Sequence, residues 1–245
     1  MHSIYIAAII TTLSSIVVWG GLYYYFLELN LKLDRYLFLL PLGAMSCPIV
    51  NLFVKMPLLK VLKDLFNIQG AIDLGTPLSF LLIFLFIPPV TEEIVKIVPA
   101  LFMKIREMDN KTLFRVAYML GFGFGLGEIW YIAYNVAKDP GMQSTPFYYF
   151  GGFMGERFIV SFIHAGLTVV ALTGFGKSIK RPGVMGLMIA ILLHAAGNVS
   201  AIIYRLRVLP EIVGQQINSL SIGILLCILV VVVTGKMRSI IKYQN

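Results

Sequence analysis

The sequence predicts an all-α, polytopic membrane protein whose helices form one bundle. Hydrophobic residues make up 58% of the 245 positions and charged residues only 13%, which excludes an ordinary soluble domain of this size. The apolar residues fall into runs near the roughly 20 residues that a helix needs to cross a bilayer, and basic residues gather at the ends of these runs. No linker rich in Ser, Gly or charge divides the chain. Residues 1–245 are therefore expected to form a single integral membrane domain.

Seven apolar runs are expected to be spanning helices, at about 4–26, 36–54, 78–103, 113–134, 157–175, 184–204 and 217–234. The first run is too long for the core of a signal peptide and has no basic region before it, so it counts as a spanning helix. Residues 55–70 are too few and too charged to span. Their leucines recur at helical spacing opposite Lys60, Lys63 and Asp64, which predicts a short helix that lies in the membrane interface.

The distribution of Lys and Arg predicts the orientation. Basic residues follow the first, third, fifth and seventh runs: Lys32, Arg35, Lys104, Arg106, Lys111, Arg115, Lys177, Lys180, Arg181, Lys236, Arg238 and Lys242. Because basic loops stay in the cytoplasm, we expect a multi-pass protein of the cell membrane with its amino terminus outside and its carboxyl terminus in the cytoplasm. The loop at 138–155 would be external, and its Pro, Tyr, Phe and Gly residues predict an interfacial or partly re-entrant segment. Topology explains the net charge of +8, so no nucleic-acid partner is expected.

Five ionisable side chains lie inside the apolar runs: Glu92, Glu93, Glu128, His164 and His194. In hydrocarbon such groups are costly unless they pair with one another or face a polar cavity. A cluster of this kind therefore indicates a functional site, for chemistry or for transport.

The third run carries two adjacent acids. Glu92 and Lys96 are four residues apart and share a helix face, whereas Glu93 points about 100° away. We expect Lys96 to hold Glu92 and leave the other carboxylate free to act. The alternative is a salt bridge that only stabilises the bundle. Pro88 and Pro89, just before the acids, are expected to kink or restart the helix and to open a polar gap beside them.

The fourth run contains a ladder of glycines at 121, 123, 125 and 127 that ends at Glu128. Such a ladder lets a neighbouring helix or an extended peptide approach the backbone closely, and helix packing is the more common use. Tyr131 and Asn135 continue the face of Glu128 and are candidates for hydrogen bonds to it or to a substrate.

The fifth and sixth runs each place a small polar residue one turn after a histidine: Thr168 after His164, and Asn198 after His194. Histidine together with carboxylate is the combination that water activation or metal binding needs. Arg157 is expected to pair with Glu156 or to extend to the interface, and no chemistry is assigned to it.

Four motifs in order on successive helices resemble the PrsW family of intramembrane proteases. They are Glu-Glu-x-x-Lys at 92–96, Phe-x-x-x-Glu at 124–128, the histidine of the fifth run, and His-x-x-x-Asn at 194–198. That family is part of a clan with the CAAX prenyl proteases, bacteriocin-processing enzymes and relatives of the APH-1 subunit of gamma-secretase. The resemblance covers about 88–204, within expected core helices at about 78–204. CAAX-type enzymes usually have histidine where this chain has Glu128, which favours PrsW.

The resemblance implies endoproteolysis of a membrane-associated protein, in PrsW itself the first cut in a transmembrane anti-sigma factor. Peptide hydrolysis needs a base, an oxyanion donor and a proton donor. The expected base is Glu92 or Glu93, tuned by Lys96, and Asn198 would donate to the oxyanion. His164, His194 and Glu128 would bind zinc or another divalent metal. The spacing typical of soluble zinc proteases is absent, so direct activation of water by the same groups, without metal, stays open.

Two other classes of function also stay open. A proton- or cation-coupled transporter would use the same buried groups as a relay, although the chain shows no paired interrupted helices in two halves. A non-catalytic scaffold similar to APH-1 would use the histidines to hold helices together, but it has little use for an unpaired second carboxylate. The oligomeric state is also open, because small residues can pack within one bundle or between two.

Overall fold

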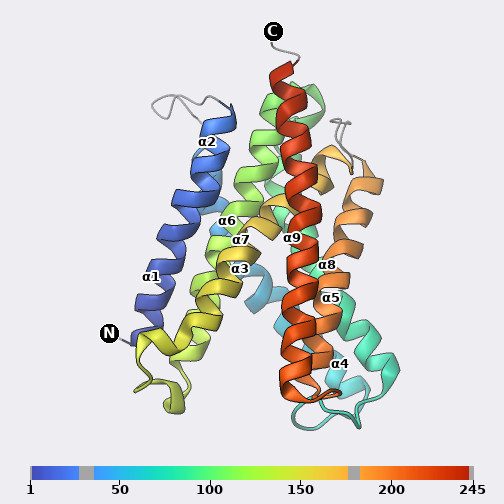
Figure 1. Cartoon of the computed structure of the whole chain (residues 1–245). Helices are drawn as coiled ribbons and strands as arrows, with labels where there is room; N and C mark the ends of the chain where they lie inside the picture. Colours follow the sequence, from blue (N-terminus) through green and yellow to red (C-terminus); the bar gives the residue numbers. More distant parts are fainter. Residues whose placement is uncertain (1, 28–35, 176–182, 243–245) are drawn as a thin grey trace.

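The computed structural model describes residues 2–27, 36–175 and 183–242. All secondary structure within these ranges is helical, and seven helical segments there are long and apolar enough to cross a membrane, as predicted. α1 begins and α9 ends at opposite ends of the bundle (Figure 1), as an odd number of crossings requires. Lys32, Arg35, Lys177, Lys180 and Arg181 lie outside the described residues, so the orientation stays a prediction.

The first and second spans are each interrupted by a π-helical turn. The first consists of α1 (Ser3–Ser15), η1 (Ile16–Gly20) and α2 (Gly21–Leu27), and the second of α3 (Leu39–Val50), η3 (Asn51–Lys55) and α4 (Met56–Leu65). The remaining elements are α5 (Leu78–Leu101), η4 (Ile105–Glu107), α6 (Asn110–Ala137), η5 (Pro140–Met142), η6 (Phe147–Phe150), α7 (Gly151–Thr173), α8 (Val184–Arg205) and α9 (Glu211–Lys242).

Three expected helix boundaries need correction. The amphipathic helix after the second run is present as α4, but it continues the second span through η3 and is not a separate element. α5 is one helix through Pro88 and Pro89, so the expected restart is wrong, whereas the alternative of a kink stays a prediction. The hydroxyl of Thr91 donates to the carbonyl of Ile87 at 2.7 Å, which adds a bond where the prolines contribute none. α7 begins at Gly151, earlier than expected, because the aromatic turn η6 leads directly into it.

α6 and α7 are the most buried of the seven spans. The glycine ladder explains the position of α6, because its members face two neighbours in alternation. A side chain at Gly121 or Gly125 would overlap the backbone of α7, and one at Gly123 or Gly127 would overlap the backbone of α3. The ladder is therefore a packing device, and it fixes the end of α6 that carries Glu128 between α3 and α7.

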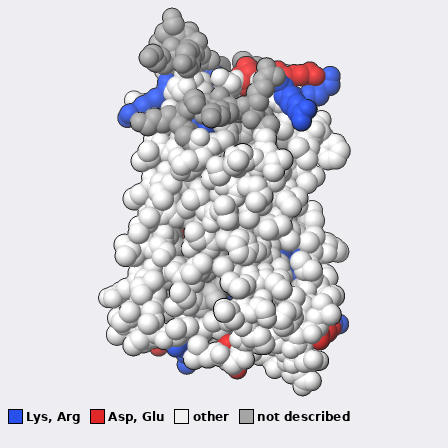
Figure 2. All heavy atoms as spheres, turned by 90° about the vertical axis from the view of Figure 1, so that its right-hand side faces the viewer, with Lys and Arg blue, Asp and Glu red and all other residues white. Residues whose placement is uncertain are grey.

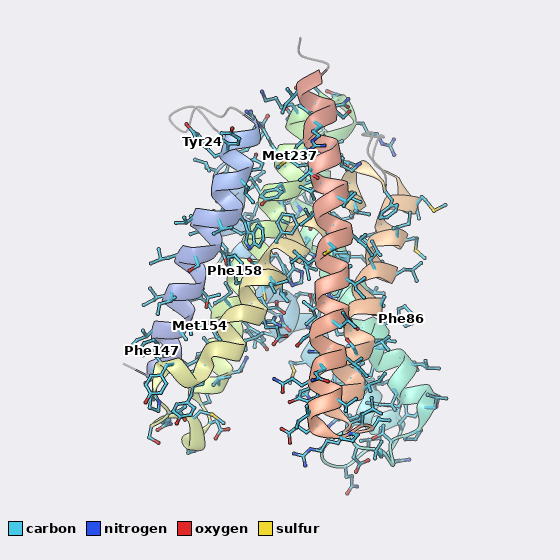
Figure 3. The ribbon with its side chains drawn as sticks, viewed as in Figure 1. Tyr24, Phe86, Phe147, Met154, Phe158 and Met237 are labelled. Carbon is cyan, nitrogen blue, oxygen red and sulfur yellow. The ribbon has the colours of Figure 1, made fainter. Side chains whose placement is uncertain are left out.

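The surface of the bundle matches a lipid environment. Figure 2 shows the charged residues of one face gathered mainly at the two ends of the molecule, with a wide uncharged belt between them. Large exposed side chains occur along the length of the bundle, with Tyr24 near one end and Phe147 near the other (Figure 3). Phe86 points outward from α5 and is 38% exposed. Phe158 lies on the side of α7 toward the first span, where its ring stacks on Trp19.

Candidate active site

The structure brings the five buried ionisable residues together. α5 supplies Glu92 and Glu93, α6 supplies Glu128, α7 supplies His164 and α8 supplies His194. The rings of the two histidines meet edge to face, with centroids 5.6 Å apart. Four helices that are distant in sequence therefore direct their polar side chains to one place inside an apolar bundle.

Glu93 is the innermost residue of the cluster. Its Oε1 accepts from Lys96 Nζ at 2.6 Å and from His194 Nδ1 at 2.7 Å. The side chains of Glu93 and Lys96 have no exposed area. Lys96 Nζ also lies 3.2 Å from His164 Nδ1, so this lysine joins the two histidines to one carboxylate. Among the described residues, Oε2 of Glu93 has no hydrogen-bond partner.

The expected pair between Glu92 and Lys96 is wrong. Lys96 pairs with Glu93, three residues before it, and Glu92 Oε1 instead binds Lys55 Nζ at 2.6 Å. The physical reason is tertiary, since η3 of the second span brings a cation to Glu92 that no pattern within α5 can reveal. The other carboxylate oxygen of Glu92 lies 3.9 Å from His194 Nε2.

Glu128 has a cation of its own. Its Oε2 accepts from Arg157 Nη1 at 2.7 Å and lies 3.1 Å from His164 Nε2. Arg157 also donates to Glu156 at 2.5 Å. This second contact was expected, but the contact with Glu128 was not. Asn135 donates to a carbonyl of its own helix and does not serve Glu128.

Lys55 and Arg157 are the two residues of the cluster that the sequence-based interpretation missed. One signal was available, since three glutamates inside apolar runs call for three cations and Lys96 is the one well inside a run. Arg157 begins the fifth run and Lys55 follows the second, and basic residues in such positions are normally topology signals. The structure thus pairs each glutamate with one cation.

Exposure divides the cluster into a sealed part and an accessible part. The side chains of Glu93 and Lys96 are fully buried, that of Glu92 is 4% exposed and that of His194 is 11% exposed. Glu128 is 18% exposed and Lys55 is 20% exposed. Glu128 and Lys55 are therefore the most accessible side chains of the cluster.

The donor set fits a divalent cation. Glu92, His164 and His194 each offer one ligand atom, and the three atoms lie within 4.8 Å of one another. Tetrahedral zinc, with bonds of 2.0–2.1 Å, would place its ligands about 3.3 Å apart, so a modest closure completes the group. Glu93 takes Nδ1 of His194 and leaves Nε2 for a metal, as outer carboxylates do for zinc-bound histidines. His164 contacts Lys96 and Glu128 with its two ring nitrogens and must give up one contact to bind.

This group of three contains Glu92 and not Glu128, the expected third ligand, which lies 3.1 Å from His164 Nε2. The polar residues one turn after the two histidines differ in their hydrogen bonds. Thr168 donates to the backbone carbonyl of His164 at 2.9 Å. Asn198 is half-buried, and its side chain makes no hydrogen bond to the described part of the chain.

A comparison with known protein families gives a clear result. Residues 33–234, more than four-fifths of the chain, match the model of the family described as PrsW family intramembrane metalloprotease. No curated protein and no solved structure matches the chain. The match includes all four helices of the site and the helix that carries Lys55. The chain belongs to the PrsW family and is a multi-pass, membrane-embedded metalloprotease.

Proposed function

We propose that this protease cleaves a transmembrane protein at a zinc or similar divalent-metal site formed by Glu92, His164 and His194. The observation that carries the proposal is the convergence of these three buried side chains within 4.8 Å, from three separate helices. A transmembrane segment is a suitable substrate because the cluster lies among apolar helices, within reach of a chain in the bilayer. An anti-sigma-factor-like protein is the substrate that the family resemblance implies. We place the enzyme in the cell membrane with its amino terminus outside.

Two kinds of residue support the metal in this proposal. Glu92, His164 and His194 would hold the metal. When bound, the cation supplies Lewis-acid polarisation of the scissile carbonyl and makes a nearby water more acidic. Glu93 orients His194 through Nδ1, and Lys96 keeps the Glu93 carboxylate in place. Full burial of this inner pair excludes water from it, so neither residue contacts substrate.

The proton acceptor that we propose is Glu128. Its Oε2 is occupied by Arg157 and His164, whereas Oε1 has no hydrogen-bond partner among the described residues. Glu128 is also the most exposed glutamate of the three, at 18% against 4% for Glu92 and none for Glu93. Oε1 would take a proton from the attacking water and return it to the leaving amine. The free side-chain amide of Asn198 would donate to the oxyanion.

This proposal exchanges the roles that the sequence pattern suggested for Glu92 and Glu128, and two variants decide between them. Purified Glu92→Gln should lose both metal and cleavage. Glu128→Gln should retain stoichiometric metal while cleavage of single-pass membrane proteins falls about 100-fold or more, the usual size of a general-base effect. Glu107→Gln, a change at a glutamate that is 73% exposed outside the cluster, is the matched control and should match wild type.

The reverse result would restore the sequence-based roles, with metal lost in Glu128→Gln and kept in Glu92→Gln. A wild-type protein that binds no divalent metal and cleaves nothing would overturn the proposal as a whole.

A further inference from the structure

Lys55 is the residue of the cluster that lies farthest outside the sequence motifs. It comes 37 residues before Glu92, yet its Nζ donates to Glu92 Oε1 at 2.6 Å. We propose that Lys55 is a positioning residue, which fixes the Glu92 carboxylate so that its second oxygen is presented to the metal. The inference rests on the proposed function, because it concerns the same metal-binding group.

The helix geometry before Lys55 supports this role. Lys55 is the last residue of the π-helical turn η3. A π turn accommodates about one extra residue, so it redirects the side chains that follow by roughly 100° relative to an unbroken α-helix. The side chain of Asn51 donates to the carbonyl of Cys47 at 2.9 Å, a bond that competes with the helical pattern. Pro57 lacks the backbone donor that an α-helix would use. Both features are compatible with the turn that directs Lys55 at Glu92, although neither predicts it from the sequence alone.

The contact leaves a defined task to each oxygen of Glu92. Lys55 occupies Oε1, and Oε2 then faces His194 Nε2 at 3.9 Å. That separation is too long for a hydrogen bond, and a cation with bonds of about 2.0–2.1 Å can touch both atoms. Without Lys55 the carboxylate is free to rotate, and either oxygen can turn away from His194.

The other cations of the cluster do not replace Lys55. Lys96 is bonded to Glu93 and Arg157 is bonded to Glu128 and Glu156. Among the described residues, Lys55 is the cation that forms an ion pair with Glu92. Its role is therefore separable from those of the other two by substitution.

The test is the zinc affinity of purified full-length variants, measured by competition with a chelator, together with cleavage and the midpoint of thermal unfolding. Lys55→Met keeps the length of the side chain and removes the ammonium. It should weaken zinc binding about 10- to 100-fold, as loss of an outer-shell partner does, with a similar loss of cleavage. Lys55→Arg, which restores a cation, should recover most of the affinity. Lys60→Met is the matched control, since Lys60 is exposed on α4, and it should bind zinc as wild type does.

Two results would overturn the positioning role and leave the proposed function intact. One is wild-type zinc affinity and cleavage in Lys55→Met, and the other is an equal loss in Lys60→Met, which would indicate a general effect of charge removal. A wild-type protein without zinc binding and without cleavage would instead contradict the proposed function. If Lys55→Met fails to fold, Lys55→Leu takes its place, because it also removes the donor to Glu92 Oε1. Zinc affinity equal to wild type in Lys55→Leu would overturn the inference.

Discussion

Glu93 and Glu128 have the same kinds of partner, a cation and a histidine, but they lie in different surroundings. The pair of Glu93 and Lys96 is fully buried, whereas Glu128 is 18% exposed and Arg157 is 12% exposed. We call the first pair the inner half of the site and the second pair the outer half. Burial makes a charge pair costly to break, so the inner half suits a fixed support. Accessibility lets a carboxylate exchange partners, so the outer half suits chemistry.

The largest loss of stability is expected when the ion pair of the inner half is removed. Glu93→Ala leaves the ammonium of Lys96 buried without a carboxylate, and loss of one partner of a buried ion pair costs about 3–5 kcal/mol. The substitution also releases His194 Nδ1, so zinc binding should fall together with stability. Unfolding in detergent, followed by tryptophan fluorescence or differential scanning, measures the first effect, and metal content of the surviving folded protein measures the second.

Glu107→Ala is the comparison for this experiment, because its pair with Lys104 is 3.8 Å long and both side chains are largely exposed. Exposed ion pairs contribute little to stability, so Glu107→Ala should be nearly as stable as wild type. If Glu93→Ala were as stable as Glu107→Ala, the distinction between the two halves would fail.

A smaller loss of stability is expected when the close packing of α6 against α3 is disturbed. The Cβ of Gly127→Ala would overlap the carbonyl of Ala44 on α3, and overpacking of this kind costs about 1–3 kcal/mol. Because Gly127 precedes Glu128, the shift should also move the outer half and lower cleavage, while the metal group, on α5, α7 and α8, stays intact. The measurements are the unfolding midpoint, cleavage rate and zinc content.

Gly223 offers a matched control on α9, because nothing lies within 4 Å of a Cβ added there. Gly223→Ala should leave cleavage unchanged and should be neutral or stabilising, since alanine favours a helix over glycine by about 1 kcal/mol. Equal effects at the two glycines would show that close backbone contact does not position α6.

The two halves also show how far the sequence predicts the site. The seven spans, the glycine contacts and the convergence of five ionisable residues follow from local patterns, namely apolar length, small residues and the cost of buried charge. The partners of the glutamates do not follow, because they depend on how helices pack. Lys96 lies within reach of both Glu92 and Glu93 on α5, and Lys55 from η3 decides which of them it binds. The π turn that places Lys55 has no simple signature, so residues 55–70 were predicted as a separate helix.

The smallest loss of stability is expected from a change at the start of α6, well away from either half of the site. Asp109 caps this helix, accepting from the backbone N–H of Thr112 at 2.8 Å and from its hydroxyl at 2.9 Å. Partial burial acts to raise the pKa of Asp109, but the hydrogen bonds from Thr112 outweigh it and hold the pKa below the usual value of the carboxyl. A lowered pKa in the folded state stabilises the protein above the pKa of the unfolded chain, near 3.9, and this contribution is lost as the pH falls through the folded value.

Asp109→Ala should therefore lower the free energy of unfolding by about 1 kcal/mol at neutral pH, the usual contribution of a helix cap. The difference from wild type should shrink as the pH falls below 4. If the glycine contacts hold Glu128 in place, this variant should cleave substrate at the wild-type rate despite its lower stability. Unfolding midpoints at several pH values and one cleavage rate at neutral pH test both statements. A loss of cleavage as large as that of Gly127→Ala would mean that the whole length of α6, and not only its glycine contacts, positions the outer half.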